Sequence, residues 1–260
     1  MIGVTIRWLG QAGFLLSAAG GRVLVDPWFS DHELRRFPPA ALDALPWPID
    51  LLLATHGHED HLDLGSLPAV IQRSPGLEVV VPEPLVERVR ASAPSAAVRG
   101  VQPGSKVSMG DLTVRAVPAW HGVTAADGYG PGPFGAAPHV GYVITFPELI
   151  FFHAGDTVPA KEIVEALDGE AVDVALLPIN GRDAVREAAG ILGNLDPAEA
   201  VRLAVDAWAW LLIPMHYDMV EGNTEDPGAA VRAAVELAAP LHVLVPSRDA
   251  DITLGSRTER

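Results

Sequence analysis

The stretch Ile49-Asp50-Leu51-Leu52-Leu53-Ala54, followed at once by Thr55-His56-Gly57-His58-Glu59-Asp60-His61, decides the fold of this chain. The apolar run predicts a buried β-strand that ends at the polar cluster. Imidazoles and carboxylates packed so densely behind a buried strand would desolvate and repel one another unless a cation or specific partners satisfied them. The stretch therefore predicts a metal site at the end of a strand, with His56, His58, Asp60 and His61 as candidate ligands.

Three more residues of the same types also follow predicted strands. They are His121 after the strand at 112–117, Asp156 after the strand at 150–153, and His216 after the strand at 211–213. Loops at strand ends are where a rigid scaffold presents converging side chains. We therefore expect these residues to join the cluster at 56–61.

Hydrophobic patterns and turn signals predict the other elements. Further strands are expected at 4–9, 13–17, 22–26, 78–81, near 107, and at 140–146, 174–177 and 241–245, and helices at 67–72, 85–91, 160–167, 197–207 and 228–238. The helix at 197–207 is expected to begin with a cap, with Asp196 as the N-cap, Pro197 at the first helical position and Glu199 completing a capping box. Two packed sheets with helices outside, forming a single domain over residues 1–260, is the expected α/β architecture.

Composition narrows the function. The chain has 260 residues and a formal charge of −15, which disfavours nucleic acid and stable membrane association, because both require a basic surface. An anionic small-molecule substrate would therefore need local positive charge. The absence of cysteine excludes thiolate ligands and fits a cytoplasmic protein.

The ordered set of motifs resembles the metallo-β-lactamase superfamily. The segment 55–61 resembles its HxHxDH signature, and the matches continue through His121, Gly155-Asp156-Thr157 and His216. The resemblance implies a four-layer αβ/βα sandwich with two divalent metal ions. It assigns His56, His58 and His121 to one metal, assigns Asp60, His61 and His216 to the other, and places Asp156 between them. Asp26 in Asp26-Pro27-Trp28 would orient a ligand imidazole by accepting its remaining N–H.

The resemblance also implies a hydrolytic mechanism. Two cations that share a water lower its pKa, so that hydroxide is available near neutral pH to attack a carbonyl carbon or a phosphorus. Asp60 and Asp156 are the implied catalytic carboxylates, with Asp60 orienting the nucleophile. No serine or cysteine nucleophile is required.

Within the superfamily, the chain is most similar to the L-ascorbate-6-phosphate lactonase-like branch. The similarity lies in Trp8-Leu9-Gly10-Gln11-Ala12-Gly13, in His153-Ala154-Gly155-Asp156-Thr157, and in the segment 213–218 followed by Asp226-Pro227. His121 departs from that branch, which carries an acidic residue there. That branch is associated with manganese, whereas a histidine-rich site also suits zinc, so both Mn²⁺ and Zn²⁺ stay open.

The substrate side is predicted less directly. Arg182 and Arg186 are candidate readers of an anionic group, although a solvated surface is the simpler interpretation. The Gly/Pro-rich loop 122–139, which carries Tyr129 and Phe134, is either a lid or a plain connection. His139 and His153 are candidates for substrate contact or for a purely structural role.

We therefore expect a lactonase acting on a small anionic metabolite. A phosphodiesterase or phospholipase D-like hydrolase is the rival enzyme, because N-acyl-phosphatidylethanolamine phospholipase D shares these motifs. A non-catalytic metal-binding module is the rival outside enzymes, and the seven ligand-type residues argue against it. A homo-oligomer is also expected on the family resemblance.

Overall fold

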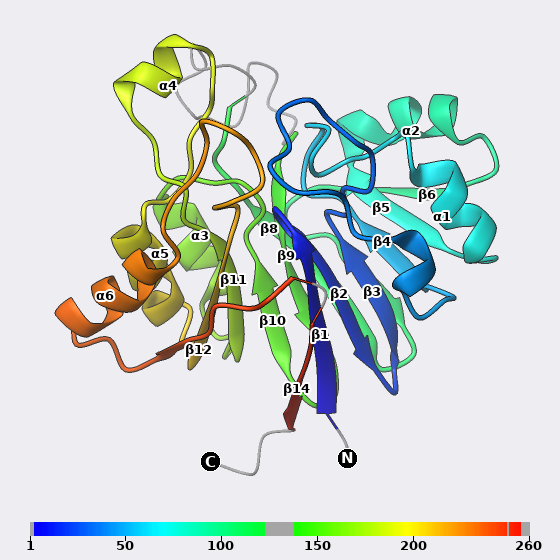
Figure 1. Ribbon diagram of the computed structural model, residues 1–260. Helices are drawn as coiled ribbons and strands as arrows, with labels where there is room; N and C mark the ends of the chain where they lie inside the picture. The colour runs from blue at the N-terminus through cyan, green and yellow to red at the C-terminus, as the bar shows by residue number, and fades with distance from the viewer. Residues whose placement is uncertain (1–2, 123–137, 249, 256–260) are drawn as a thin grey trace.

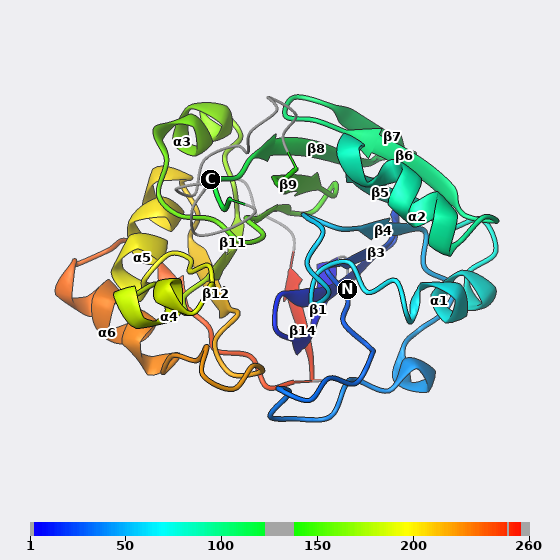
Figure 2. The ribbon, with the colours of Figure 1, turned by 90° about the horizontal axis from the view of Figure 1, so that it is seen from above.

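The computed structural model describes residues 3–122, 138–248 and 250–255. Two seven-stranded sheets pack face to face, and helices cover the outer face of each (Figures 1 and 2). The predicted four-layer α/β sandwich is therefore confirmed. No helix within these described ranges is long and apolar enough to cross a membrane.

The first sheet has the order β14-β1-β2-β3-β4-β5-β6. Its strands are β1 (Gly3–Gly10), β2 (Gly13–Ala18), β3 (Gly21–Val25), β4 (Leu51–Leu53), β5 (Glu78–Pro82), β6 (Ala97–Val101) and β14 (Asp251–Gly255). β14, β1, β2 and β3 pair antiparallel, whereas β3, β4, β5 and β6 run parallel.

The second sheet has the order β13-β12-β11-β10-β9-β8-β7. Its strands are β7 (Lys106–Met109), β8 (Leu112–Pro118), β9 (Val140–Thr145), β10 (Ile150–His153), β11 (Val174–Pro178), β12 (Leu211–Met215) and β13 (His242–Val243). β7 to β10 pair antiparallel, and β10 to β13 run parallel. Each sheet thus combines an antiparallel part with a parallel part.

Short helices flank the sheets. They are η1 (Leu42–Ala44), α1 (Leu67–Arg73), η2 (Glu83–Leu85), α2 (Val86–Ser92), α3 (Lys161–Leu167), α4 (Ala184–Ala188), α5 (Pro197–Asp206) and α6 (Gly228–Glu236). Figure 2 shows α1 and α2 outside the first sheet and α3, α5 and α6 outside the second. α4 lies at the end of the sandwich that is uppermost in Figure 1.

The strand that leads to the histidine cluster is buried on both faces, as its apolar run predicts. Leu51 and Leu53 belong to the core shared by the two sheets. Leu52 belongs to a separate core beneath α1 and α2, together with Val70 and Val89. Because side chains alternate along a strand, three leucines in a row fill both cores and fix where the strand ends.

The prediction missed β6, α4, β14 and the short η1, and it was wrong in the extent of one strand. β6, α4 and β14 carry weak local patterns, and every residue of β14 is at least partly exposed. The strand expected at 241–245 is reduced to β13, a two-residue edge strand. β14 instead returns to the first sheet, where the bidentate pair between Arg7 and Asp251 fixes it at 2.7 and 2.8 Å.

The start of α5 is capped as predicted, which generates a stability test. Asp196 accepts a hydrogen bond from the Glu199 backbone N–H, and the Glu199 side chain accepts one from the Asp196 N–H. We expect Asp196→Ala to lower the free energy of unfolding by about 1 kcal/mol and Asp196→Asn to lower it much less. Urea unfolding measures both. Asp206→Ala in the last turn is the control, because an aspartate there opposes the helix dipole; equal losses at the two positions would contradict capping.

Candidate metal centre

The strand directions bring the polar residues to one edge of the sandwich. β1, β3 and β4 point the same way in the first sheet, as do β8, β10 and β12 in the second. The residues that follow their carboxyl ends are Gln11, Asp26, the segment 55–61, His121, Asp156 and His216. The sheet topology thus explains why seven residues spread over 161 positions, from 56 to 216, meet in one place.

Four of the seven predicted ligands form one group. Each of His56, His58, His121 and Asp156 offers one ligand atom, and these atoms lie within 4.8 Å of one another. The Nε2 atom of His56 lies 2.8 Å from Nδ1 of His58, and Nε2 of His121 lies 3.5 Å from Oδ2 of Asp156. The first three are the histidines assigned to one metal by the sequence resemblance.

The other three form a second group. The ligand atoms of Asp60, His61 and His216 also lie within 4.8 Å of one another. Oδ2 of Asp60 is 3.6 Å from Nε2 of His61 and 3.4 Å from Nε2 of His216. The carboxylate of Asp156 reaches toward this group as well, with Oδ1 3.4 Å from His61 Nε2 and Oδ2 3.3 Å from His216 Nε2.

Asp26 holds one imidazole of the cluster from behind. Its carboxylate is fully buried, and Oδ2 lies 2.7 Å from Nδ1 of His61. Thr55 donates to the same carboxylate twice, from its backbone N–H at 2.7 Å and from its hydroxyl at 2.6 Å. With Nδ1 of His61 donating to Asp26, Nε2 is left to face the second group.

Gln11 is a site residue that the sequence did not single out for this role. Its Nε2 donates to Asp60 Oδ2 at 2.7 Å and lies 3.0 Å from His216 Nε2. A polar residue in an otherwise apolar hairpin connection was the available signal. Gln11, Asp26 and His216 also share a left-handed backbone, with φ of 51°, 43° and 58°. Such strain gathers where a scaffold must aim a side chain.

Burial and charge divide the histidines into two kinds. Burial lowers the pKa of His56 and His58 below their ordinary value and that of His121 to about 3. Burial acts in the same direction on His61 and His216, but the neighbouring carboxylates, Asp156 foremost, outweigh it. They raise the pKa of His61 well above its ordinary value and that of His216 to about 9.

The donor set fits divalent cations. Nε2 of His61 and Oδ1 of Asp156 are buried and face each other, yet neither has a hydrogen-bond partner among the described residues. A cation between such atoms would satisfy both. Five imidazoles and two carboxylates are the nitrogen and oxygen ligands that zinc, manganese and iron accept.

The two predicted substrate-side histidines are placed differently. The His139 ring centroid lies 5.5 Å from that of His56 and 5.6 Å from that of His121, beside the first group. His153 is fully buried, and both its ring nitrogens are engaged by backbone. Nε2 lies 2.8 Å from the carbonyl of Ala12, and Nδ1 accepts from the N–H of Gly155 at 3.1 Å. This placement favours a positioning role for His153 over substrate contact.

The two predicted anion readers are engaged within the protein. Arg182 makes a bidentate ion pair with Glu199 at 2.7 and 2.8 Å. Arg186 pairs with Asp183 and donates to the Asn223 side chain at 2.9 Å. They brace the segment 180–195 that precedes α5. Tyr129 and Phe134, the residues of the suggested lid, lie outside the described residues.

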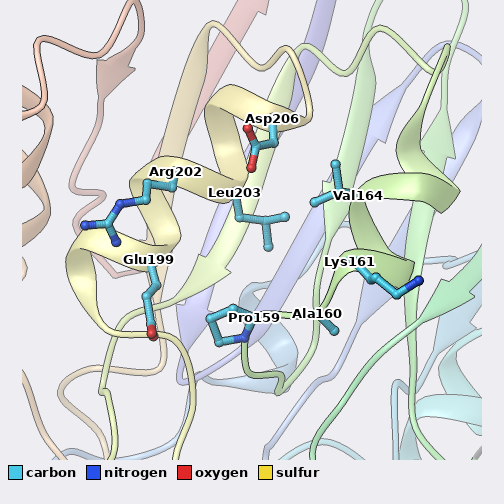
Figure 3. A pocket seen from close by; sticks show the side chains of 8 residues that line it. All are labelled: Pro159, Ala160, Lys161, Val164, Glu199, Arg202, Leu203 and Asp206. Atoms are coloured by element: carbon cyan, nitrogen blue, oxygen red, sulfur yellow. The ribbon is translucent and has the colours of Figure 1, made fainter.

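A separate groove of about 400 Å³ lies between α3 and α5 (Figure 3). Figure 3 shows Val164 and Leu203 pointing toward each other across it. The other lining residues are Pro159, Ala160, Lys161, Glu199, Arg202 and Asp206. These eight residues offer no imidazole and include none of the clustered ligands, so we place the chemistry at the histidine cluster.

Comparison with known proteins agrees with this fold. Residues 21–217 match the Beta-lactamase superfamily domain. The chain is 32% identical to the UPF0173 metal-dependent hydrolase of Methanopyrus kandleri over 92% of this chain and 95% of the relative. It is 31% identical to that of Myxococcus xanthus over 96% and 83%. The solved structure of Igni18, a metallo hydrolase from Ignicoccus hospitalis, has a TM-score of 0.76 at 22% identity and covers 98% of this chain and 99% of its own.

Fold, histidine cluster and relatives together define a metal-dependent hydrolase of the metallo-β-lactamase superfamily. Within that superfamily, the chain belongs to the family of UPF0173 metal-dependent hydrolases. The names of these relatives carry no substrate, so the similarity to the lactonase branch remains a prediction.

Gly155 tests how tightly the two sheets meet behind the cluster. Its φ is +61°, and a Cβ there would lie 2.7 Å from Thr55 Oγ1. We expect Gly155→Ala to displace Thr55 and Asp26, weaken metal binding, and lower the free energy of unfolding by about 1 to 3 kcal/mol more than its control. The control is Gly169→Ala, because Gly169 has φ +78° but nothing within 4 Å of the added Cβ. Equal effects in the two variants, measured by chemical unfolding and competitive metal titration, would contradict this account.

The raised pKa of His216 predicts that metal binding releases a proton from it, whereas the lowered pKa of His121 predicts none from that residue. At pH 7.5 the metal-free protein holds a proton on His216, whose pKa is about 9, while His121, with a pKa of about 3, is already neutral. Only a deprotonated imidazole ligates a metal, so saturation should release at least one proton per chain, and less above pH 9. Titration calorimetry in two buffers of different ionisation enthalpy counts these protons. His216→Ala should release about one proton fewer, and an unchanged count would exclude His216 as their source.

Proposed function

We propose that this protein hydrolyses a lactone of a small anionic metabolite at a centre of two divalent metal ions. The observation that carries the proposal is the convergence of seven buried or half-buried ligand-type side chains in two adjoining groups. His56, His58 and His121 would hold one ion, Asp60, His61 and His216 the other, and Asp156 both. Mn²⁺ and Zn²⁺ are the candidate ions.

The metals would provide hydroxide near neutral pH and stabilise negative charge that develops on the substrate oxygen. The protein's own groups would prepare that chemistry. Asp26 fixes the ring orientation of His61, and Gln11 fixes the carboxylate of Asp60. Burial acts to raise the pKa of Asp60, but the charge of His61 and the hydrogen bond from His216 lower it below its ordinary range. Asp60 therefore stays ionised and can accept a hydrogen bond from the attacking water.

The carboxylate of Asp60 is the most accessible acid of the centre. Its side chain is 21% exposed, against 5% for Asp156. Oδ2 is occupied by Gln11 and the two histidines, which leaves Oδ1 for the nucleophile. We assign the orientation of the attacking water to Asp60 and the alignment of the two ligand groups to Asp156.

The lactone preference rests on the motifs shared with the lactonase-like branch, in particular the two segments around Gln11 and Gly155 that adjoin the centre. Gln11 contacts the ligand Asp60 directly, and Gly155 packs against Thr55, which holds Asp26 behind the ligand His61. A phosphodiesterase is the second candidate, because the same centre would serve attack on phosphorus. The acidic net charge of −15 counts against its lipid-directed version.

Metal analysis and a substrate panel test the proposal together. Protein stripped of metal and reloaded with Mn²⁺ or Zn²⁺ should bind about two equivalents per chain and turn over lactones faster than bis-p-nitrophenyl phosphate. Turnover of the phosphodiester alone would contradict the lactonase proposal and favour a phosphodiesterase. Metal binding without any turnover would favour a non-catalytic module.

A matched pair of variants tests the role of Asp60. Asp60→Asn should retain the melting temperature within a few degrees and lower kcat by at least about 100-fold, since it removes a ligand and the orienting charge. Glu59→Gln makes the same chemical change at the exposed neighbouring position and should leave kcat unchanged. Similar kcat values for the two variants would remove Asp60 from the mechanism.

A further inference from the structure

Three arginines lie on the chain segments that adjoin the candidate metal centre. Arg35 and Arg36 follow β3, in the segment that leaves Asp26, and Arg248 precedes β14. The backbone N–H of Arg36 donates to Met219 at 2.9 Å, and a β-bridge joins Arg35 to Val220. The arginine segment therefore runs beside the chain that leaves His216.

A chain of contacts through Met219 and Gln11 links Arg248 to the ligands. Nη1 of Arg248 lies 3.6 Å from the sulfur of Met219. Met219 packs on Gly10 so closely that a Cβ there would lie 2.9 Å from its sulfur. Gln11, the next residue, contacts Asp60 and the ring of His216. Arg248 is thus joined to the second ligand group. Arg35 lies next to Arg248, because the carbonyl of Phe37 accepts a hydrogen bond from Nε of Arg35 while its ring lies against the guanidinium of Arg248.

Aromatic rings fix two of the guanidinium groups in place. Cζ of Arg35 lies 4.0 Å from the ring centroid of Trp28, and Cζ of Arg248 lies 3.6 Å from that of Phe37. Stacking on a ring restricts the guanidinium plane while leaving its edge free to donate hydrogen bonds. Little conformational entropy then remains to be lost when an anion binds.

Charge pairing separates these two arginines from Arg36. Arg36 pairs with Glu221 at 3.5 Å. By contrast, no carboxylate oxygen in the described part of the chain lies within 4.0 Å of a guanidinium nitrogen of Arg35 or Arg248. Asp218, whose charge acts on Arg248, makes no such pair either. Asp31, Asp63 and Asp60 act on the charge of Arg35 only from beyond ion-pair distance. Both half-buried guanidinium groups can therefore still pair with an anion.

The hydrogen bonds of Arg35 leave donor capacity. Its Nε donates to the carbonyl of Phe37 at 3.2 Å, and its Nη1 donates to the carbonyls of Trp28 and Ser30 at 3.2 and 3.3 Å. Nη2 makes no hydrogen bond to the described residues. Nε1 of Trp28, beneath the guanidinium, is a further donor, and it is buried without a partner in the described ranges.

We propose that Arg35 and Arg248 form an anion-binding subsite that holds an oxyanion group of the substrate, a phosphate or a carboxylate, at the edge of the metal centre. This inference rests on the proposed hydrolase function and names the feature by which the enzyme selects its substrate. It replaces Arg182 and Arg186, which their ion pairs already engage, as the readers of negative charge. It also explains how so acidic a protein accommodates an anionic metabolite.

Phosphate binding by the metal-free protein tests the subsite without requiring catalysis. Inorganic phosphate is titrated calorimetrically into the wild type, Arg35→Gln and Arg248→Gln. We expect each variant to bind phosphate at least 10-fold more weakly and Arg248→Lys to keep intermediate affinity. Arg22→Gln is the control, because Arg22 also has no ion pair in the described chain but lies at the opposite end of β3.

Folding is checked by thermal melting of every variant. Arg248→Gln decides the question if Arg35→Gln unfolds, since Arg35 supports three backbone carbonyls whereas Arg248 donates to one sulfur. Unchanged phosphate affinity in Arg248→Gln overturns the proposal. A loss of equal size in Arg22→Gln overturns it as well, because it would mark a nonspecific charge effect.

Kinetics with a matched substrate pair then locates the subsite relative to the reaction. For the metal-loaded enzyme, Arg248→Gln should raise KM for 6-phosphogluconolactone about 10-fold, leave kcat nearly unchanged, and leave δ-gluconolactone unaffected. Equal effects on both lactones would overturn the substrate-reading role. If neither lactone is hydrolysed by the wild type, the lactonase proposal fails, and the phosphate titration still decides whether the subsite exists.

Discussion

The buried carboxylate of Asp26 supports much of the structure around the centre. Asp26 follows the last residue of β3 and has a left-handed backbone conformation. Its carboxylate accepts three hydrogen bonds, two from Thr55 and one from His61. A buried carboxylate without such donors would cost several kcal/mol, so the segment after β4 is held in the one arrangement that supplies them. Gly155 brings the second sheet against Thr55, where no side chain would fit. Both sheets therefore meet at a single hydrogen-bonded network behind the ligands.

The same surroundings account for the different pKa shifts of the histidines in the two ligand groups. His56, His58 and His121 lie where burial dominates, and their lowered pKa values keep them neutral. His61 and His216 lie among carboxylates, Asp156 foremost, which raise their pKa values against the effect of burial. The two ligand groups are therefore prepared differently for a cation, although they share Asp156.

The arginines away from the centre also fall into two kinds, those paired with a carboxylate and those without such a partner in the described chain. The arginines of segment 180–195 are bound to Glu199 and Asp183, and the pair with Glu199 holds that segment against the start of α5. Arg35 and Arg248 instead rest on aromatic rings and lack carboxylate partners in the described chain. A common scaffold thus keeps its metal ligands at strand ends, while the loops beside them determine which substrate reaches the ligands.

The sequence by itself determined the sandwich, the cluster at 55–61 and the strand-end positions of His121, Asp156 and His216. These signals are local, since an apolar run, a capping box or a dense group of ligands is read within a few neighbouring residues. The sequence did not indicate Gln11 as a partner of Asp60, or β14 as a strand of the first sheet. It also did not show that Arg182 and Arg186, its candidate anion readers, are engaged in ion pairs with Glu199 and Asp183.

Those features depend on contacts between residues far apart in the chain. Gln11 meets a carboxylate 49 positions away, and Arg7 pairs with an aspartate 244 positions away. Whether an arginine is neutralised or left to bind an anion depends on which carboxylate the fold places within reach, and no local pattern encodes that distance. The sequence thus set the chemical groups of the centre, and the tertiary structure decided which of them support, neutralise or expose one another.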